Sequence, residues 1–204
     1  IRTDSNNLTI TPGTSSAFKV SGNAQLLATA AGSEIKVAGD ITGVDDTSSD
    51  EKITISVNSG STSGTVTVDG NIAGANAAGG FKTVTLEGAT KVNLGGDITL
   101  GNFTGGSVTV TGPAVLKDAV TVDADASDGS ISFSSTINND DSGTARNLTL
   151  TTGTGSISVG GIIGDVANSG VAIGVIDINK TSGTGAITLA GIGGASAAGN
   201  AGTV

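Results

Sequence analysis

Several side chains that most catalytic and metal sites require are missing from this chain. It has no cysteine, histidine, tryptophan, tyrosine or methionine, and only 4 of its 204 residues are phenylalanine. The absence of cysteine excludes disulfide bonds and thiolate metal sites. The commonest general base and the best nucleophile are absent as well, because these are histidine and cysteine. We therefore expect a protein that is not an enzyme.

The charges also narrow the range of partners. Nine Lys and Arg against 18 Asp and Glu give a formal net charge of −9, whereas nucleic acid and anionic lipid both require a positive surface. No apolar run approaches the ~20 residues of a membrane-spanning helix. We therefore expect neither nucleic-acid binding nor membrane insertion. The basic residues are scattered, mostly in or beside predicted strands, where single lysines discourage edge pairing: Lys19, Lys36, Lys52, Lys82, Lys91, Lys117, Arg146 and Lys180.

The chain is instead rich in glycine, with 34 residues, and in short alternating segments. The clearest lies at Gly129–Asp165, with strand-like stretches at Ser130–Ile137, Asn147–Thr151 and Ser156–Ile163. Apolar and hydroxyl residues alternate in them, which is typical of a strand with one buried face. Gly, Asn and Asp fill the gaps and favour sharp turns. The small aliphatic residues suit thin stacked layers better than a wide core.

One short motif recurs along the chain. Two apolar residues flank a polar one, followed by a small or turn residue and usually a final apolar residue. The first positions are 31, 26, 39, 26 and 30 residues apart, and a period of ~20–50 residues is typical of solenoids, propellers or arrays. Propeller blades would need four long antiparallel strands, whereas these strands are short. The copies are Ile35–Ile41, Val66–Ile72, Val92–Ile98, Ile131–Ile137 (which lacks the glycine), Ile157–Ile163 and Ile187–Gly193.

These features predict an all-β fold, a parallel β-helix (β-solenoid) of irregular coils with glycine corners. We expect residues 1–204 to form a single solenoid segment, a fragment or processed piece of a longer chain, with a Gly/Ala-rich tail at 191–204. Interior side chains of successive coils should stack about 4.8 Å apart. A charge at Val92 or Ile157 should therefore damage the neighbouring coils too. Corner glycines such as Gly96 should relieve the Cβ clash of a tight bend.

The segment GSISFSSTINNDDSGTARNLTLTTGTGSISVGGIIGD resembles the repeats of filamentous-haemagglutinin-type adhesins, which are long bacterial proteins exported by two-partner secretion or as autotransporters. The resemblance is clearest over Gly129–Gly194 and extends more loosely over Lys52–Leu100. It implies a right-handed parallel β-helix stalk and an extracellular location on the bacterial cell surface. The secretion-signal domain of that family has no counterpart in this sequence, so an export route is implied by the resemblance alone.

One acidic turn offers a candidate metal site. Asp123, Asp125 and Asp128 place oxygen ligands in a spacing that begins like a calcium-binding loop. The usual loop has Gly at its sixth position and Glu at its twelfth, where this chain has Asp128 and Ser134. Calcium is therefore a candidate ligand of the three aspartates, and the alternative is a solvated acidic corner. No other cofactor is expected. Two further acidic stretches match less well, 138–141 and 45–51, and the second should belong to an exposed loop at 43–51.

The sequence favours a structural or adhesive module, a β-solenoid stalk or filament of a secreted surface protein. Its partners would be other copies or neighbouring repeats of the same protein, and glycans on host or cell surfaces. Two alternatives remain open. One is a self-assembling surface-layer or sheath subunit. The other is a carbohydrate-active β-helix enzyme, in which Asp123 and Asp125 would imitate a pair of catalytic carboxylates about 5–10 Å apart.

Overall fold

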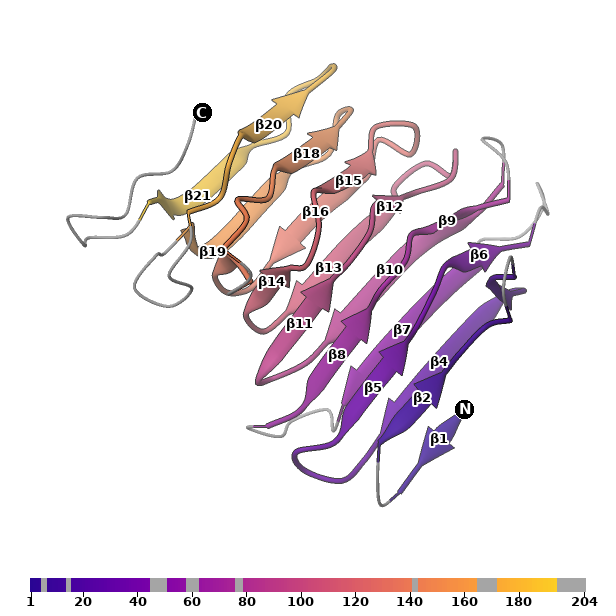
Figure 1. The fold of residues 1–204 in the computed structure, drawn as a ribbon. Coiled ribbons are helices and arrows are strands. Elements are labelled where there is room, and N and C mark those ends of the chain that lie inside the picture. Colours follow the sequence, from indigo (N-terminus) through magenta and orange to yellow (C-terminus); the bar gives the residue numbers. More distant parts are fainter. Residues whose placement is uncertain are drawn as a thin grey trace.

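The chain winds as a parallel β-solenoid of about six turns. The computed structural model describes residues 1–4, 7–13, 16–44, 51–57, 63–75, 79–140, 143–164 and 172–193. Figure 1 shows the strands stacked as successive rungs, with β1 (Arg2–Thr3) and β21 (Ile187–Ile192) at opposite ends. A typical coil contributes three short strands, one to each of three faces. The predicted fold class is therefore confirmed, while the handedness implied by the resemblance stays a prediction.

The three faces are named here A, B and C in the order in which the chain enters them. Face A holds β1, β4 (Asn23–Ala28), β7 (Glu51–Val57), β10 (Phe81–Glu87), β13 (Ser107–Thr111), β16 (Ser130–Phe133), β19 (Ile157–Ile163) and β21. Face B holds β2 (Leu8–Ile10), β5 (Glu34–Val37), β8 (Thr65–Val68), β11 (Lys91–Leu94), β14 (Ala114–Leu116) and β17 (Ile137–Asn139). Face C holds β3 (Phe18–Val20), β6 (Ile41–Gly43), β9 (Ile72–Gly74), β12 (Ile98–Thr99), β15 (Val120–Ala124), β18 (Leu148–Thr152) and β20 (Ile176–Lys180).

Strand β19 joins two of these faces. Its first half pairs with β16 on face A, and its last residue, Ile163, pairs with Ile137 of β17 on face B. The hydrogen-bonded strands of faces A and B therefore form one continuous sheet of 14 strands, whereas face C is a separate sheet of seven.

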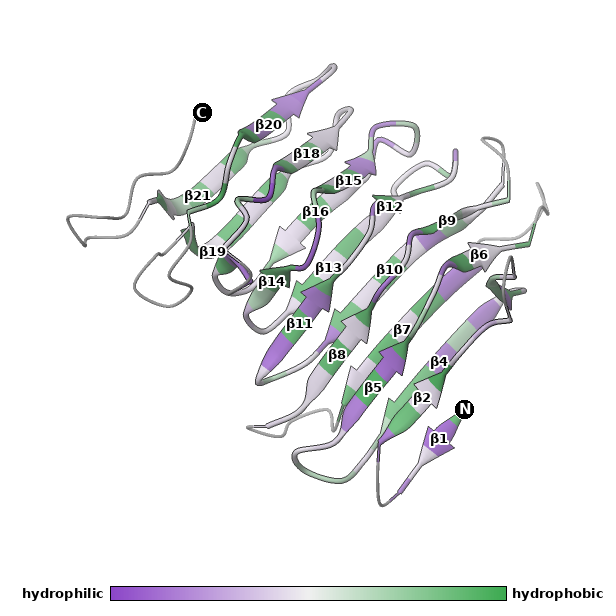
Figure 2. Ribbon diagram, in the orientation of Figure 1, coloured by the Kyte–Doolittle hydropathy of each residue, from purple (hydrophilic) through white to green (hydrophobic). Residues whose placement is uncertain are grey.

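The interior consists of rows of aliphatic side chains that run along the axis. In Figure 2 apolar and polar bands alternate along the strands, and the apolar bands of neighbouring strands line up. Each buried Val or Ile contributes roughly 1.5–3 kcal/mol relative to an exposed one, and its stacking partners lie in the adjacent coils. The predicted interior rows are confirmed. On face B the row comprises six paired residues that are all 0% exposed: Ile35, Val66, Val92, Ala114, Ile137 and Ile163.

The recurring motif passes from one face to another in the middle of the chain. Its first three copies begin on face B, in β5, β8 and β11, whereas its last three begin on face A, in β16, β19 and β21. Val92 pairs with Ala114, and Ile131 pairs with Val108. The equivalence of Val92 and Ile131, at the interval of 39 residues, is therefore wrong. Both faces bury alternate residues, so the motif does not distinguish them.

The corners between faces B and C are held by Asp and Asn side chains. Asp40 Oδ1 accepts the backbone N–H of Asn71 one coil on, at 2.8 Å, and Asn71 Oδ1 accepts that of Asp97, also at 2.8 Å. Asp97 Oδ1 in turn accepts the N–H of Thr121 at 2.7 Å. A short side chain with a carbonyl-type oxygen can replace the backbone partner that a turn removes. This explains why a glycine and then Asp or Asn stand before the final apolar residue of the motif at these three corners.

The corner glycines are confirmed in position, and their surroundings give the reason for them. Gly96 does not have a left-handed φ angle. A Cβ atom at Gly96 would instead lie 2.6 Å from the carbonyl carbon of Gly70 in the preceding coil. Glycine is therefore required there because two backbones approach closely.

Two smaller expectations fall at the borders of the described residues. Glu51 is fully buried and begins β7, so its assignment to an exposed loop is wrong, while 45–50 lie outside the described residues. Strand β21 runs to Ile192, into the predicted tail, of which 194–204 lie outside the described residues. No helix in the described part of the chain is long and apolar enough to cross a bilayer.

Candidate functional site

An open groove of about 750 Å³ crosses the outer side of face B, over β11, β14 and β17. Its centre is formed by Asn93, Val115 and Asn138, which occupy one register position in three successive coils. These residues face outward because alternate residues of a strand point to opposite sides. The other lining residues are Thr90, Lys91, Pro113, Lys117, Ser135, Thr136, Asn139 and Asp140. The groove is therefore lined by amides, hydroxyls and charges around a small apolar centre.

The Asn93 amide is almost buried, with 8% of the residue exposed. Its Nδ2 donates a hydrogen bond to Thr67 Oγ1 at 2.9 Å, and Thr67 Oγ1 donates to Glu34 Oε1 at 2.7 Å. This chain of bonds runs along the outer row of face B, away from the groove. Asn93 Oδ1 is buried and has no hydrogen-bond partner in the described structure. Such atoms are uncommon in proteins and call for an explanation.

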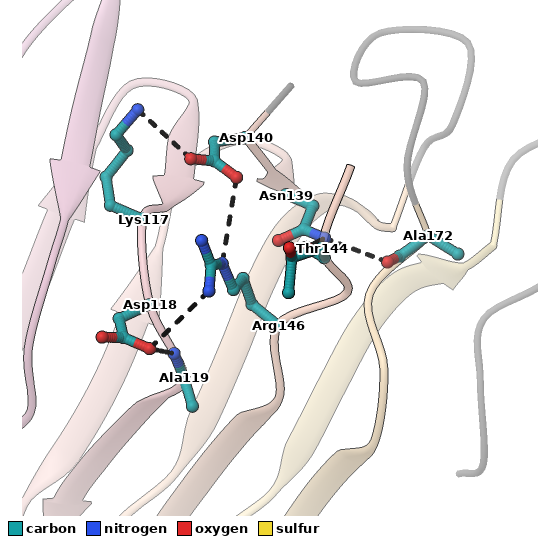
Figure 3. A network of polar contacts seen from close by, with 8 residues as sticks. All are labelled: Lys117, Asp118, Ala119, Asn139, Asp140, Thr144, Arg146 and Ala172. Carbon is teal, nitrogen blue, oxygen red and sulfur yellow. Dashed lines mark hydrogen bonds and ion pairs between the residues drawn. The ribbon is translucent and has the colours of Figure 1, made fainter. Parts of the chain in front are cut away.

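Asn139, at the end of β17, is the register partner of the interior residue Leu116, so its side chain lies on the inner side of face B. It is 2% exposed, and its Nδ2 donates to the carbonyl oxygens of Thr144, at 2.8 Å, and Ala172, at 3.1 Å (Figure 3). Its Oδ1 is buried without a hydrogen-bond partner in the described part of the chain. Of these two unpartnered oxygens in the described structure, only Asn93 Oδ1 belongs to a side chain on the outer side of face B, where the groove lies.

One end of the groove carries a cluster of charges. Lys117 Nζ lies 3.3 Å from Asp140 Oδ2, and Arg146 Nε lies 3.9 Å from Asp140 Oδ1 (Figure 3). Arg146 also lies 3.9 Å from Asp118, which is mostly exposed. The Asp140 side chain is only 11% exposed, so its negative charge is largely enclosed by two cations.

The other end of the groove carries a single cation. Lys91 begins β11, is exposed, and has no ion-pair partner among the described residues. In register it lies beside Pro113, four residues before Lys117. At about 3.3 Å per residue, the two lysines are roughly 13 Å apart along the strand direction. The groove thus has a positive group at each end, in a chain with a net charge of −9.

The sequence alone did not reveal this site. Lys91 and Lys117 look like two scattered solubilising lysines, yet the fold places them at the two ends of one groove. Asn93 and Asn138 are far apart in sequence and are brought together only by the stacking of coils. One sequence signal could have indicated this alignment. Asn93 follows Val92 and Asn138 follows Ile137, and both preceding residues belong to the interior row of face B.

Two shifted pKa values lie outside the groove. Asp69 forms an ion pair with Lys36 at 2.9 Å and raises the lysine pKa above its ordinary value. Near the chain start, hydrogen bonds from Arg2 and then Thr29 lower the pKa of Asp4. All four groups are exposed or partly exposed, and screening keeps such pairs weak. These shifts therefore indicate surface pairing rather than a reactive centre.

The three aspartates of the predicted calcium site lie at the end of β15 and in the turn after it. Asp123 Oδ1 accepts the backbone N–H of Asp125 at 2.9 Å, and Asp125 Oδ1 accepts the hydroxyl of Thr181. Asp128 has a φ angle of 49° and its Oδ1 accepts the N–H of Thr154 at 2.8 Å. In the described structure the carboxylates therefore hold this turn and the adjoining coils together.

Calcium binding at Asp123, Asp125 and Asp128 stays a prediction. The described residues include no group of three acidic side chains arranged to hold a metal ion, so binding would require these carboxylates to rearrange. A calorimetric titration with CaCl₂ tests it. Of the other acidic stretches, 45–50 and 141 lie outside the described residues.

Comparisons with protein-family models, with curated proteins and with solved structures found no match to this chain. The interpretation of the site therefore depends on its own geometry and chemistry.

Proposed function

We propose that the chain is a structural and adhesive module, a β-solenoid stalk or filament of an extracellular bacterial surface protein. The observation that carries the proposal is the continuous stacking of interior residues, such as the six-residue row of face B, through the described coils. Such an architecture extends in one dimension and presents long outer faces. The resemblance to filamentous-haemagglutinin-type repeats supports the same role and the same location.

The last described coil supports self-association or stacking on a neighbouring repeat. Ile187 occupies the interior row of face A, beside Ile157, yet it is 44% exposed. Because this aliphatic row ends in a partly exposed residue, another coil could add to it, from the same protein or from a second copy. This agrees with partners of the same kind as the chain itself.

The absence of enzymatic activity is part of the proposal. Asp123 and Asp125 both accept hydrogen bonds from the chain, and Asp140 is the only acid among the described residues that line the groove. Hydrolysis of a glycosidic bond ordinarily uses two carboxylates on either side of the scissile bond. The groove is therefore better suited to binding than to cleavage.

Adhesion of coated beads tests the proposal. Beads carrying the purified chain should attach to glycan-bearing cells, and beads carrying the surface variant Thr109→Asp should attach as well. Beads carrying Ile157→Asp should fail, because a buried unpaired charge disrupts the coil that supports the surface. Equal attachment by the disrupted variant, or no attachment by the native chain, would overturn the adhesive role. Electron microscopy that shows sheets or continuous sheaths would favour the surface-layer alternative, and cleavage of a glycan panel the enzyme.

A further inference from the structure

We propose that the groove over β11, β14 and β17 binds a short oligosaccharide that carries carboxylate groups, such as an oligogalacturonate. The volume of about 750 Å³ falls within the ~300–1,000 Å³ of ordinary small-molecule sites. The proposal deepens the adhesive function by naming a ligand class and a location. The biological role of the site rests on the proposed adhesive function, whereas the binding itself is argued from the groove.

The lining matches the hydrogen-bonding groups of a sugar. Sugar hydroxyls both donate and accept, and the side chains of Asn138, Ser135 and Thr136 offer both kinds of partner. The buried amide oxygen of Asn93 has no donor in the described structure. A hydroxyl that reached it would make a hydrogen bond that the described protein does not supply.

The centre of the groove suits the carbon face of a sugar ring. Val115 and Pro113 supply an aliphatic surface of limited area among the polar groups. None of the lining residues that the structure describes is aromatic, so aromatic stacking on them supplies no affinity. Recognition must therefore come chiefly from hydrogen bonds and charge.

The charges select an acidic ligand over a neutral one. Lys91 has no ion-pair partner among the described residues and stands at one end of the groove, while Lys117 stands at the other. Asp140, the only acid among the described lining residues, is paired with Lys117 and Arg146. A carboxylate near Lys91 would therefore gain a charge-assisted hydrogen bond at the end of the groove opposite Asp140.

Calorimetry and NMR with the intact chain test this inference. Trigalacturonate should bind, and its carboxyl-reduced neutral counterpart should bind about tenfold more weakly or worse, which corresponds to the loss of one charge-assisted bond. Lys91→Ala should weaken trigalacturonate binding by a similar factor, while Lys52→Ala, the same change on face A, should leave it unchanged. Binding should also weaken as salt is added. Side-chain amide signals of Asn93 and Asn138 should shift on titration.

A second pair of variants separates the groove from the rest of the surface. Val115→Phe should fill the centre of the groove and abolish binding, whereas Thr109→Phe, on the outer side of β13, should not. Circular dichroism tests whether each variant is folded. If Val115→Phe does not fold, the effect of Lys91→Ala on trigalacturonate binding tests the location of the site instead. Equal affinity for the neutral sugar, an unaffected Lys91→Ala variant, or the absence of trigalacturonate binding would each overturn the inference. Bead attachment that survives Lys91→Ala would leave the adhesive function standing without this site.

Discussion

At the residue scale, small side chains and glycines decide how closely two coils can approach. The corner column Gly70–Gly96 brings backbone atoms so near that a Cβ at Gly96 would fall 2.6 Å from Gly70. Beside it, Asp40, Asn71 and Asp97 accept the N–H groups of the following coil. The corner therefore depends on two residue types with different tasks, one that leaves space and one that supplies an acceptor.

Gly96→Ala should destabilise the protein by about 1–3 kcal/mol, the usual cost of forcing extra carbon into a filled space. The matched control is Gly13→Ala, because a Cβ there would have its nearest neighbour, Ser16 Oγ, at 3.8 Å. That change should be neutral or slightly stabilising. Urea denaturation of both variants measures the difference, and equal midpoints would contradict the close approach of the two coils.

At the scale of strands, stability comes from the interior rows. Ile157 of β19 is 0% exposed and lies between Ile131 of β16 and Ile187 of β21. Its neighbour Ser158 faces outward. Removal of side-chain carbon atoms from Ile157 should therefore destabilise three coils, whereas removal of the outward hydroxyl of Ser158 should destabilise none.

Ile157→Ala should cost about 2–5 kcal/mol in the free energy of unfolding, whereas Ser158→Ala should stay within about 0.5 kcal/mol. Hydrogen exchange should show faster exchange of the amides of β16 and β21 as well as those of β19 in the first variant. Loss of protection confined to β19 would argue against stacking between coils.

The sequence predicts where strands lie better than it predicts which face each strand joins. Alternation predicts strands at Asn147–Thr151 and Ser156–Ile163, within one residue of β18 and β19, because burial of every second residue is a local property. The face that a strand joins is not local, which is why Val92 could be matched to Ile131. The partner that the fold selects, Ala114, is smaller and follows a proline, so the motif is faint there.

The groove was beyond prediction for a related reason. It needs the outward residues Asn93, Val115 and Asn138 side by side, and their alignment depends on the number of residues in each intervening loop. The acidic turn also has contacts that the sequence does not show. Asp123 and Asp128 look like ligands in sequence, but their oxygens accept backbone N–H groups in the structure.

At the scale of the whole molecule, each coil is a unit that can be removed. Ser107 and Ser130 are register partners, so deletion of 108–130 joins Ser107 directly to Ile131 and preserves every face. We expect a folded protein about 4.8 Å shorter. Its stability should fall by about 1–3.5 kcal/mol, at 0.05–0.15 kcal/mol for each lost residue.

The control is a deletion that stops within the coil. Removal of 108–119 joins Ser107 to Val120, which moves β15, a face C strand, into the position of the face A strand β13. This variant should not fold cooperatively. Small-angle X-ray scattering and thermal melts followed by circular dichroism compare the two, and similar behaviour of both deletions would contradict the three-faced winding.

Because the interior rows join each coil to its immediate neighbours, a rod pulled from its ends should yield from an end inward. Ile131 and its partner Ile157 are 26 residues apart, so the release of such a coil would lengthen the chain by roughly 85–95 Å at ~3.3–3.6 Å per residue. Tension would be dissipated in a succession of small ruptures while the remaining coils stayed wound. A tether built in this way would lengthen under load before it detached.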